Sequence, residues 1–151
     1  MQITLSPIGY ISNIRTEAID DNWGNIRSVI TLGADYPAEG LDGIEAFSHV
    51  IIVYYFDRVG DDKIQTGSRH PRDNASLPKV GIFAQRAKMR PNRIGITTCK
   101  LIERNGNQIT VEGLDAIDGT PVLDIKPYMK EFDSRDSQQP EWVKEIMKNY
   151  F

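Results

Sequence analysis

A glycine-flanked basic segment is the strongest candidate for chemistry in this sequence. It spans residues 81–95 and carries three arginines around a proline: Arg86, Arg90, Pro91 and Arg93. Guanidinium groups bind phosphate or carboxylate through fork-shaped pairs of donors, and a proline in the turn reduces the entropy lost on binding. The segment therefore predicts an anion-binding turn. The alternative is structural: one of these arginines pairs with Asp115 or Asp118 to hold the fold closed.

A second candidate is the stretch from Gly113 to Pro121, in which Asp115 and Asp118 stand three residues apart between glycines. Such a stretch favours a turn whose backbone N–H and C=O groups are free to bind a ligand. The commoner alternative is an Asx-type turn in which the aspartates make only local hydrogen bonds.

Single residues give weaker signals. His70 lies in a polar loop and is expected to be exposed, whereas His49 begins an apolar strand and is expected to be structural. Cys99 is expected to be a small core residue, because no histidine is near it in the sequence. Trp23 lies in a polar loop and must either pack inward or stack on a planar ligand. The familiar glycine-rich nucleotide motifs and the metalloprotease and serine-hydrolase motifs are absent.

The elements that must position these residues are mostly strands. Alternation and β-branched residues predict strands over 3–14, 26–32, 49–56, 80–84, 94–103, 108–112 and 121–125. Asn105-Gly-Asn107 predicts a hairpin turn, 41–47 a short helical turn, and 140–150 the one convincing helix. Because strands follow strands, we predict an all-β fold: a closed or nearly closed, mainly antiparallel β-barrel with a C-terminal helix.

Composition narrows the class of protein. The 151 residues suit a single domain over 1–151, and 40% hydrophobic and 26% charged residues are typical of globular proteins. The longest apolar stretch, Val50 to Phe56, is too short to cross a bilayer, and no signal peptide is visible. A single cysteine excludes a disulfide framework and indicates the cytoplasm, and one cysteine with two histidines predicts no metal site.

Charge is distributed unevenly along the chain. The net charge is −3, yet the segment from Arg69 to Lys100 carries eight basic residues against the single acid Asp73, a local balance of +7. Such asymmetry indicates an anionic partner, although a basic face that is merely solvated would give the same pattern.

Several separated motifs, in order, resemble one known family, the TsaA-like or TrmO-type tRNA methyltransferases, in its short form. The resemblance is carried by residues 7–12, 40–49, 70–71, 81–86, 90–95 and 113–128, including Asp118-Gly-Thr-Pro and Asp124-Ile-Lys-Pro-Tyr. It implies a β-barrel, non-Rossmann methyltransferase that uses S-adenosyl-L-methionine and forms a homodimer with the cofactor near the subunit interface. The implied reaction is N6-methylation of threonylcarbamoyladenosine beside the tRNA anticodon.

The resemblance also implies site residues. Cofactor contacts are expected at Asn22, Trp23, Gly24, Asp57, Arg58, Arg86, Ile96, Leu114, Asp115, Ala116 and Ile117. The general-base candidates are Asp118, His70 and Tyr128, and the substrate-binding candidates are Arg90, Arg93 and Lys88, with Arg90 expected to bind the threonyl carboxylate. The sequence departs from the family pattern in two places: residues 22–24 replace a Pro-Arg-Gln type, and Arg93 replaces a proline.

Two other functions stay open at this point. A non-catalytic RNA-binding barrel, similar to an OB-fold, predicts salt-dependent RNA affinity without cofactor binding. A methyltransferase acting on another RNA or on a small molecule predicts cofactor binding without activity on threonylcarbamoylated tRNA.

Overall fold

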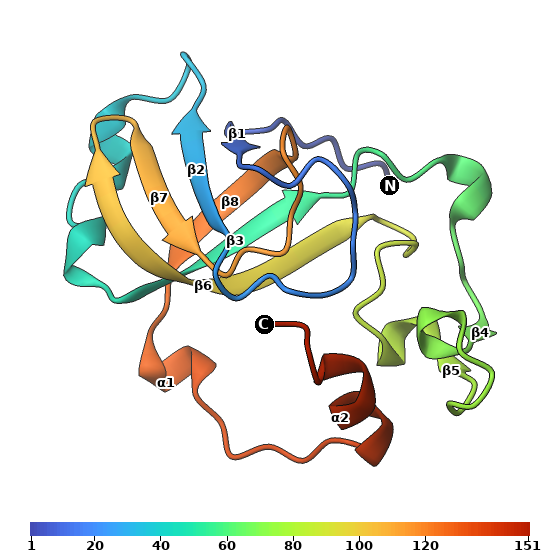
Figure 1. Cartoon of the computed structure of the whole chain (residues 1–151). Helices are drawn as coiled ribbons and strands as arrows, with labels where there is room; N and C mark the ends of the chain where they lie inside the picture. Colours follow the sequence, from blue (N-terminus) through green and yellow to red (C-terminus); the bar gives the residue numbers. More distant parts are fainter.

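Six antiparallel strands close into a barrel in the computed structural model, which describes all residues 1–151 (Figure 1). The strand order around the barrel is β1-β2-β7-β6-β3-β8. The bounds are β1 Gly9–Ser12, β2 Arg27–Leu32, β3 His49–Tyr55, β6 Ile94–Asn105, β7 Gln108–Glu112 and β8 Pro121–Pro127. The predicted antiparallel β-barrel is therefore confirmed, and so is the hairpin turn between β6 and β7.

The barrel interior is filled by residues that alternate along each strand. In β6 the buried positions Gly95, Thr97 and Cys99 alternate with exposed ones, as a strand with one face on a core requires. The core gathers side chains from every barrel strand: Ile11, Ile30, Val50, Ile52, Cys99, Ile109, Val111 and Val122. Cys99 is buried there, as predicted, and burial raises the pKa of its thiol, which makes it a poor nucleophile.

A close contact between β3 and β6 depends on a glycine. Tyr54 pairs with Gly95 across the two strands, and its ring fills the space that a Cβ at position 95 would need. The missing side chain leaves room for the large ring beside the neighbouring backbone. Tyr54 therefore points into the barrel with its hydroxyl directed toward one end, where the candidate site lies.

Several predicted boundaries were wrong. The strand expected over 3–14 is limited to β1, and the strand expected over 80–84 is only β5, Val80–Gly81, paired with the equally short β4, Ser68–Arg69. A 3₁₀ helix at Ile82–Ala84 follows β5 directly. The helical turn expected over 41–47 is two 3₁₀ helices, Ala38–Leu41 and Ile44–Ala46, separated by Gly43 at φ +83°. The spacing of apolar residues did not reveal where these short elements begin and end.

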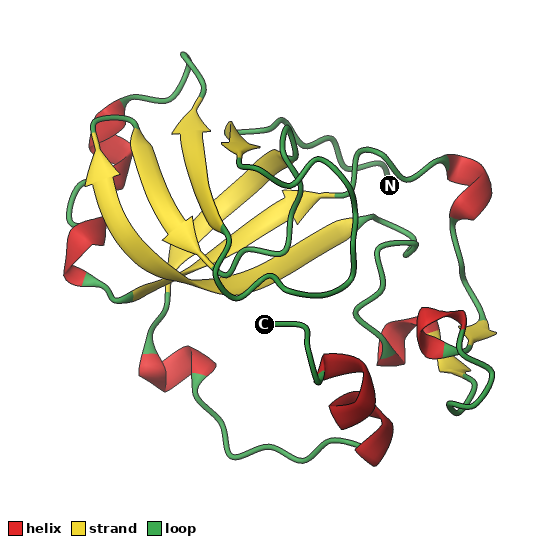
Figure 2. Cartoon of the chain, in the orientation of Figure 1, coloured by secondary structure: helices red, strands yellow, loops and turns green.

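Two excursions leave the barrel (Figure 2). One spans residues 57–93 and contains the 3₁₀ helices Asp61–Lys63 and Pro71–Asp73 besides β4 and β5. The other follows β8 through the unpredicted α1, Lys130–Asp133, and an exposed stretch to α2, Glu141–Met147, which is shorter than the predicted helix over 140–150. No helix has the length and apolar character needed to cross a membrane.

Candidate functional site

The loop between β1 and β2, residues 13–26, forms one side of the candidate site and is here called the Trp23 loop. Its shape is held by Arg15, whose guanidinium donates to the carbonyl oxygens of Asp21 at 2.5 Å and Asn22 at 2.7 Å. The same group lies 4.5 Å from the centroid of the Trp23 ring. Trp23 is buried and its Nε1–H donates to the Ile19 carbonyl, so of the two sequence alternatives the ring packs inward.

The turn between β7 and β8, residues 113–119, forms the second side and is here called the Asp115 turn. The Asp115 carboxylate accepts hydrogen bonds from three hydroxyl groups, those of Tyr54 at 3.0 Å, Tyr150 at 2.5 Å and Thr97. Burial, and then the Asp115 charge, raise the pKa of Tyr54 and of Tyr150 above the ordinary tyrosine value. Both phenols therefore stay protonated and remain donors to Asp115.

Asp118 ties the Asp115 turn to the Trp23 loop. Its Oδ1 accepts from the Asn13 backbone N–H at 3.0 Å, and its own N–H donates to the Arg15 carbonyl at 2.7 Å. Arg58 spans the same gap, donating to the carbonyl oxygens of Asp118 at 2.9 Å and Thr16 at 3.1 Å. Because the carboxylates of the turn bond distant residues, the alternative of purely local Asx hydrogen bonds is wrong.

The basic segment and β6 form the third side. The Arg86 guanidinium donates to the carbonyl oxygen of Ile96, and the Ile96 side chain is 48% exposed on the outer face of β6. Asp57 is exposed beside Arg58 at the end of β3. Hydrogen bonds thus join the Trp23 loop, the Asp115 turn and Arg58 to one another, and Arg86 to Ile96, whose neighbour Thr97 bonds Asp115.

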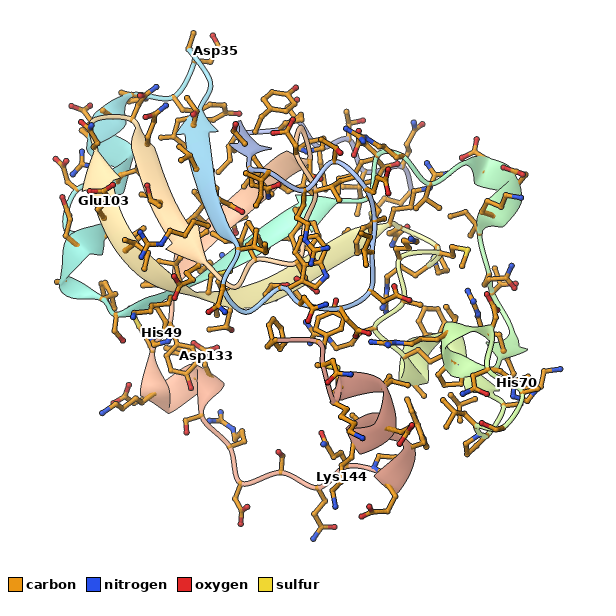
Figure 3. All side chains as sticks on the ribbon, in the orientation of Figure 1. Asp35, His49, His70, Glu103, Asp133 and Lys144 are labelled. Carbon is orange, nitrogen blue, oxygen red and sulfur yellow. The ribbon has the colours of Figure 1, made fainter.

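The structure does not bring the three general-base candidates together. Asp118 lies in the Asp115 turn, whereas the Tyr128 ring packs 6.2 Å from His49. His70 lies in the 57–93 excursion, where its Nδ1 donates to the Leu77 carbonyl at 2.7 Å. Figure 3 shows His49 and His70 on opposite sides of the molecule. Within one chain, only Asp118 is adjacent to the predicted cofactor residues.

The substrate-binding candidates lie in the same basic segment as Arg86. Arg90 donates to the Gln85 carbonyl at 3.0 Å, and Lys88 is half-buried between these arginines in the sequence. Arg93 donates to the Tyr55 hydroxyl at 2.9 Å and pairs with Asp61, so it fastens the excursion to β3. The expected structural alternative, an ion pair with Asp115 or Asp118, is not formed by Arg86, Arg90 or Arg93.

Sequence reasoning missed several residues of this site. Tyr54 lies within a continuous apolar run that indicated only core, and Thr97 carries no motif. Tyr150 ends the helix predicted over 140–150, yet it lies beyond α2 and reaches Asp115. The only available signal was that both tyrosines carry a hydroxyl that must find a partner when buried. No group of three or more histidine, cysteine or acidic side chains is arranged to hold a metal ion.

Comparison with known proteins identifies relatives of this architecture. A family model described as the tRNA-methyltransferase O N-terminal domain matches residues 20–134. An Archaeoglobus fulgidus protein named S-adenosyl-L-methionine-binding protein is 34% identical over 145 residues, which are 90% of this chain and 99% of that protein. The human tRNA (adenine(37)-N6)-methyltransferase is 45% identical over 98 residues, which are 65% of this chain and 22% of that enzyme.

Solved structures agree with the sequence relatives. The crystal structure of TrmO from Pseudomonas aeruginosa superposes with a TM-score of 0.73 at 31% identity, covering 92% of this chain and 62% of that one. The chain spans 55%, 28% and 24% of the length of the first three curated relatives. Since the family model covers most of the chain and the barrel is shared, this chain belongs to the TrmO N-terminal domain family.

Proposed function

We propose that this chain is an S-adenosyl-L-methionine-dependent methyltransferase that acts on tRNA, adding a methyl group to N6 of threonylcarbamoyladenosine beside the anticodon. The observation that carries the proposal is the convergence of the Trp23 loop, the Asp115 turn, Arg58, Arg86 and Ile96 at one end of the barrel. The proposed target atom, N6 of a tRNA adenine, follows the name of the human relative, and the proposed reaction, methyl transfer, follows from membership of the family.

The residues at this site fit such a cofactor. Asp115 accepts hydrogen bonds from three hydroxyl groups. The two hydroxyl groups of a ribose would donate to a carboxylate in the same way. Arg86 offers a guanidinium for the methionine carboxylate. Ile96 presents an exposed apolar surface, and backbone groups of the Asp115 turn can bond the edge of the adenine.

The chain's own contribution to the reaction is positioning and proton removal. S-adenosyl-L-methionine supplies an electrophilic sulfonium methyl group, so orientation of the target nitrogen provides much of the rate. That nitrogen is a weak nucleophile, and a general base helps it to react. We assign this role to Asp118 first, because its Oδ1 is held by the Asn13 N–H while the carboxylate stays beside the cofactor residues. His70 and Tyr128 remain candidates supplied by a second subunit.

Substrate binding falls to the basic segment. The stretch from Arg69 to Lys100 that contains it has a local charge of +7, which suits the tRNA backbone. Arg90 is assigned to the threonyl carboxylate, with Arg93 and Lys88 beside it. Arg90 donates only to a backbone carbonyl in the free chain, which leaves other N–H groups of its guanidinium to bind an anion.

We further propose that residues 1–151 act as one domain, in a cytoplasmic homodimer with the cofactor near the subunit interface. The exposed face of β6 and the 3₁₀ helix at Ile82–Ala84 present apolar side chains to solvent: Phe83 is 76% exposed, Ile96 48% and Ile94 38%. A second copy that covers them would remove this apolar surface from water.

The test is a paired assay on the purified protein. S-adenosylhomocysteine binding is measured first by calorimetry, and methyl transfer is then measured on tRNA with and without the threonylcarbamoyl group. Binding together with transfer only to the modified tRNA supports the proposal. Binding without that transfer favours another RNA or a small molecule as substrate, and RNA affinity without cofactor binding favours the RNA-binding barrel.

A further inference from the structure

The last residues of the chain lie directly on the predicted cofactor residues of the Trp23 loop. Residues 148–151, here called the C-terminal strap, follow α2 and return to the barrel (Figure 1). The Asn22 N–H donates to the Asn149 carbonyl and the Trp23 N–H to the Tyr150 carbonyl, both at 2.8 Å. At Gly24, a Cβ atom would lie 2.6 Å from the Phe151 carbonyl carbon. The strap therefore covers three consecutive residues to which cofactor binding is assigned.

The Tyr150 side chain lies between the Trp23 loop and the Asp115 turn. Its hydroxyl donates to Asp115 Oδ2 at 2.5 Å, and the Arg72 guanidinium lies 5.9 Å from the centroid of its ring. Arg72 is itself fixed by an ion pair with Asp21 at 2.7 Å. An aromatic ring with a guanidinium near its face and a hydroxyl on a carboxylate resembles, in its contacts, a bound nucleoside.

We propose that the C-terminal strap is an internal competitor for the nucleoside part of the cofactor site: Tyr150 uses Asp115 as a ribose hydroxyl would, and the strap must leave before S-adenosyl-L-methionine binds. This inference rests on the proposed function. The strap then sets the fraction of molecules able to bind, because a site that is open only part of the time has a correspondingly weaker apparent affinity.

The attachment of the strap allows such an exchange. α2 contains no fully buried residue, and every residue from Ser134 to Pro140 is exposed. Segments with few buried contacts open at low free-energy cost. The Phe151 residue is 62% exposed, and its ring lies 4.9 Å from the Tyr150 ring. The hydrogen bonds that hold the strap to the barrel are the one from the Tyr150 hydroxyl and two from the backbone of the Trp23 loop.

The test is calorimetric titration of the full chain with S-adenosylhomocysteine. Tyr150→Phe removes only the bond to Asp115, and we expect it to tighten binding by about threefold to tenfold. Tyr150→Ala also removes the ring and is expected to tighten binding further. Tyr10→Phe is the matched control, because Tyr10 is exposed on β1, and it is expected to bind like the wild type.

A second measurement follows the strap itself. Hydrogen exchange of peptides covering residues 134–151 is expected to become faster when S-adenosylhomocysteine is added, because the strap is displaced. The competitor proposal alone is overturned if the wild type binds and both Tyr150 variants bind equally or more weakly. Slower exchange of these peptides would overturn it as well. Absence of binding by the wild type and by the folded Tyr150 variants overturns the proposed function as well.

Discussion

The guanidinium of Arg15 lies 4.5 Å from the centroid of the Trp23 ring while it donates hydrogen bonds to the carbonyl oxygens of Asp21 and Asn22. One side chain thus holds both the aromatic ring and the backbone of the Trp23 loop. The loop has no regular secondary structure of its own between β1 and β2, so its shape depends on such contacts.

The first prediction concerns this side chain. Arg15→Ala removes the two hydrogen bonds and the cation–π contact, and we expect the free energy of unfolding to fall by about 2 kcal/mol. Arg15→Lys keeps the positive charge but loses the paired N–H donors of the guanidinium. Its free energy of unfolding is therefore expected to lie between those of Arg15→Ala and the wild type. Urea denaturation measures both. Equal stability of the Ala variant and the wild type would show that the loop is held by other contacts.

The second prediction separates the general base from cofactor binding. Asp118→Asn keeps an oxygen that accepts the Asn13 N–H, so the fold should be retained. Loss of the base is expected to lower the turnover rate about 100-fold. Affinity for S-adenosylhomocysteine should stay unchanged. Asp35→Asn, at an exposed loop tip far from the site, is the matched control (Figure 3). A normal rate for Asp118→Asn would transfer the role to His70 or Tyr128.

The third prediction concerns recognition of the modified base. Arg90→Ala is expected to reduce the preference for threonylcarbamoylated tRNA over unmodified tRNA by about tenfold or more, since a charge-assisted contact is lost. Its affinity for S-adenosylhomocysteine should remain close to that of wild type. Arg135→Ala, in the exposed stretch before α2, serves as the control. A parallel loss of cofactor affinity and substrate preference would contradict this assignment.

The fourth prediction follows from the tyrosines at Asp115. The pKa of both Tyr54 and Tyr150 is raised above the ordinary value of 10 by burial and by the Asp115 charge. The folded chain therefore holds these protons more tightly than the unfolded chain. The resulting stabilisation is complete below about pH 10 and is lost as the pH rises toward the folded-state pKa values.

Denaturation from about pH 8 to about pH 11 measures this effect. We expect the free energy of unfolding to fall at the alkaline end, and to fall less in Tyr150→Phe than in wild type. The Tyr10→Phe control should behave like wild type. A Tyr150→Phe variant as sensitive to alkali as the wild type would show that the Tyr150–Asp115 bond does not contribute.

The barrel could be predicted from sequence because its strands carry their own signal. β6 and β7 alternate cleanly around the Asn105–Asn107 turn, and β3 is a continuous apolar run that pairs on both edges. The short elements could not be predicted in the same way. β4 and β5 each have two residues, and their pairing depends on how the 57–93 excursion folds back, which local sequence does not determine.

The site was partly predictable for a related reason. Glycine and aspartate indicated the Asp115 turn, a family motif indicated Arg86, and the position of residues 22–24 in the family pattern indicated that loop. The hydroxyl groups that meet at Asp115 come from three segments far apart in the chain, β3, β6 and the C-terminal strap, so no spacing rule joins Tyr54, Thr97 and Tyr150.

The most direct test of the central claim is calorimetric titration of the purified protein with S-adenosylhomocysteine, at concentrations high enough to favour a dimer. We expect saturable binding of about one ligand per chain, because the predicted cofactor residues form a single proposed site in each barrel. Absence of binding to a folded, dimeric sample and to its Tyr150→Ala variant would contradict the methyltransferase assignment.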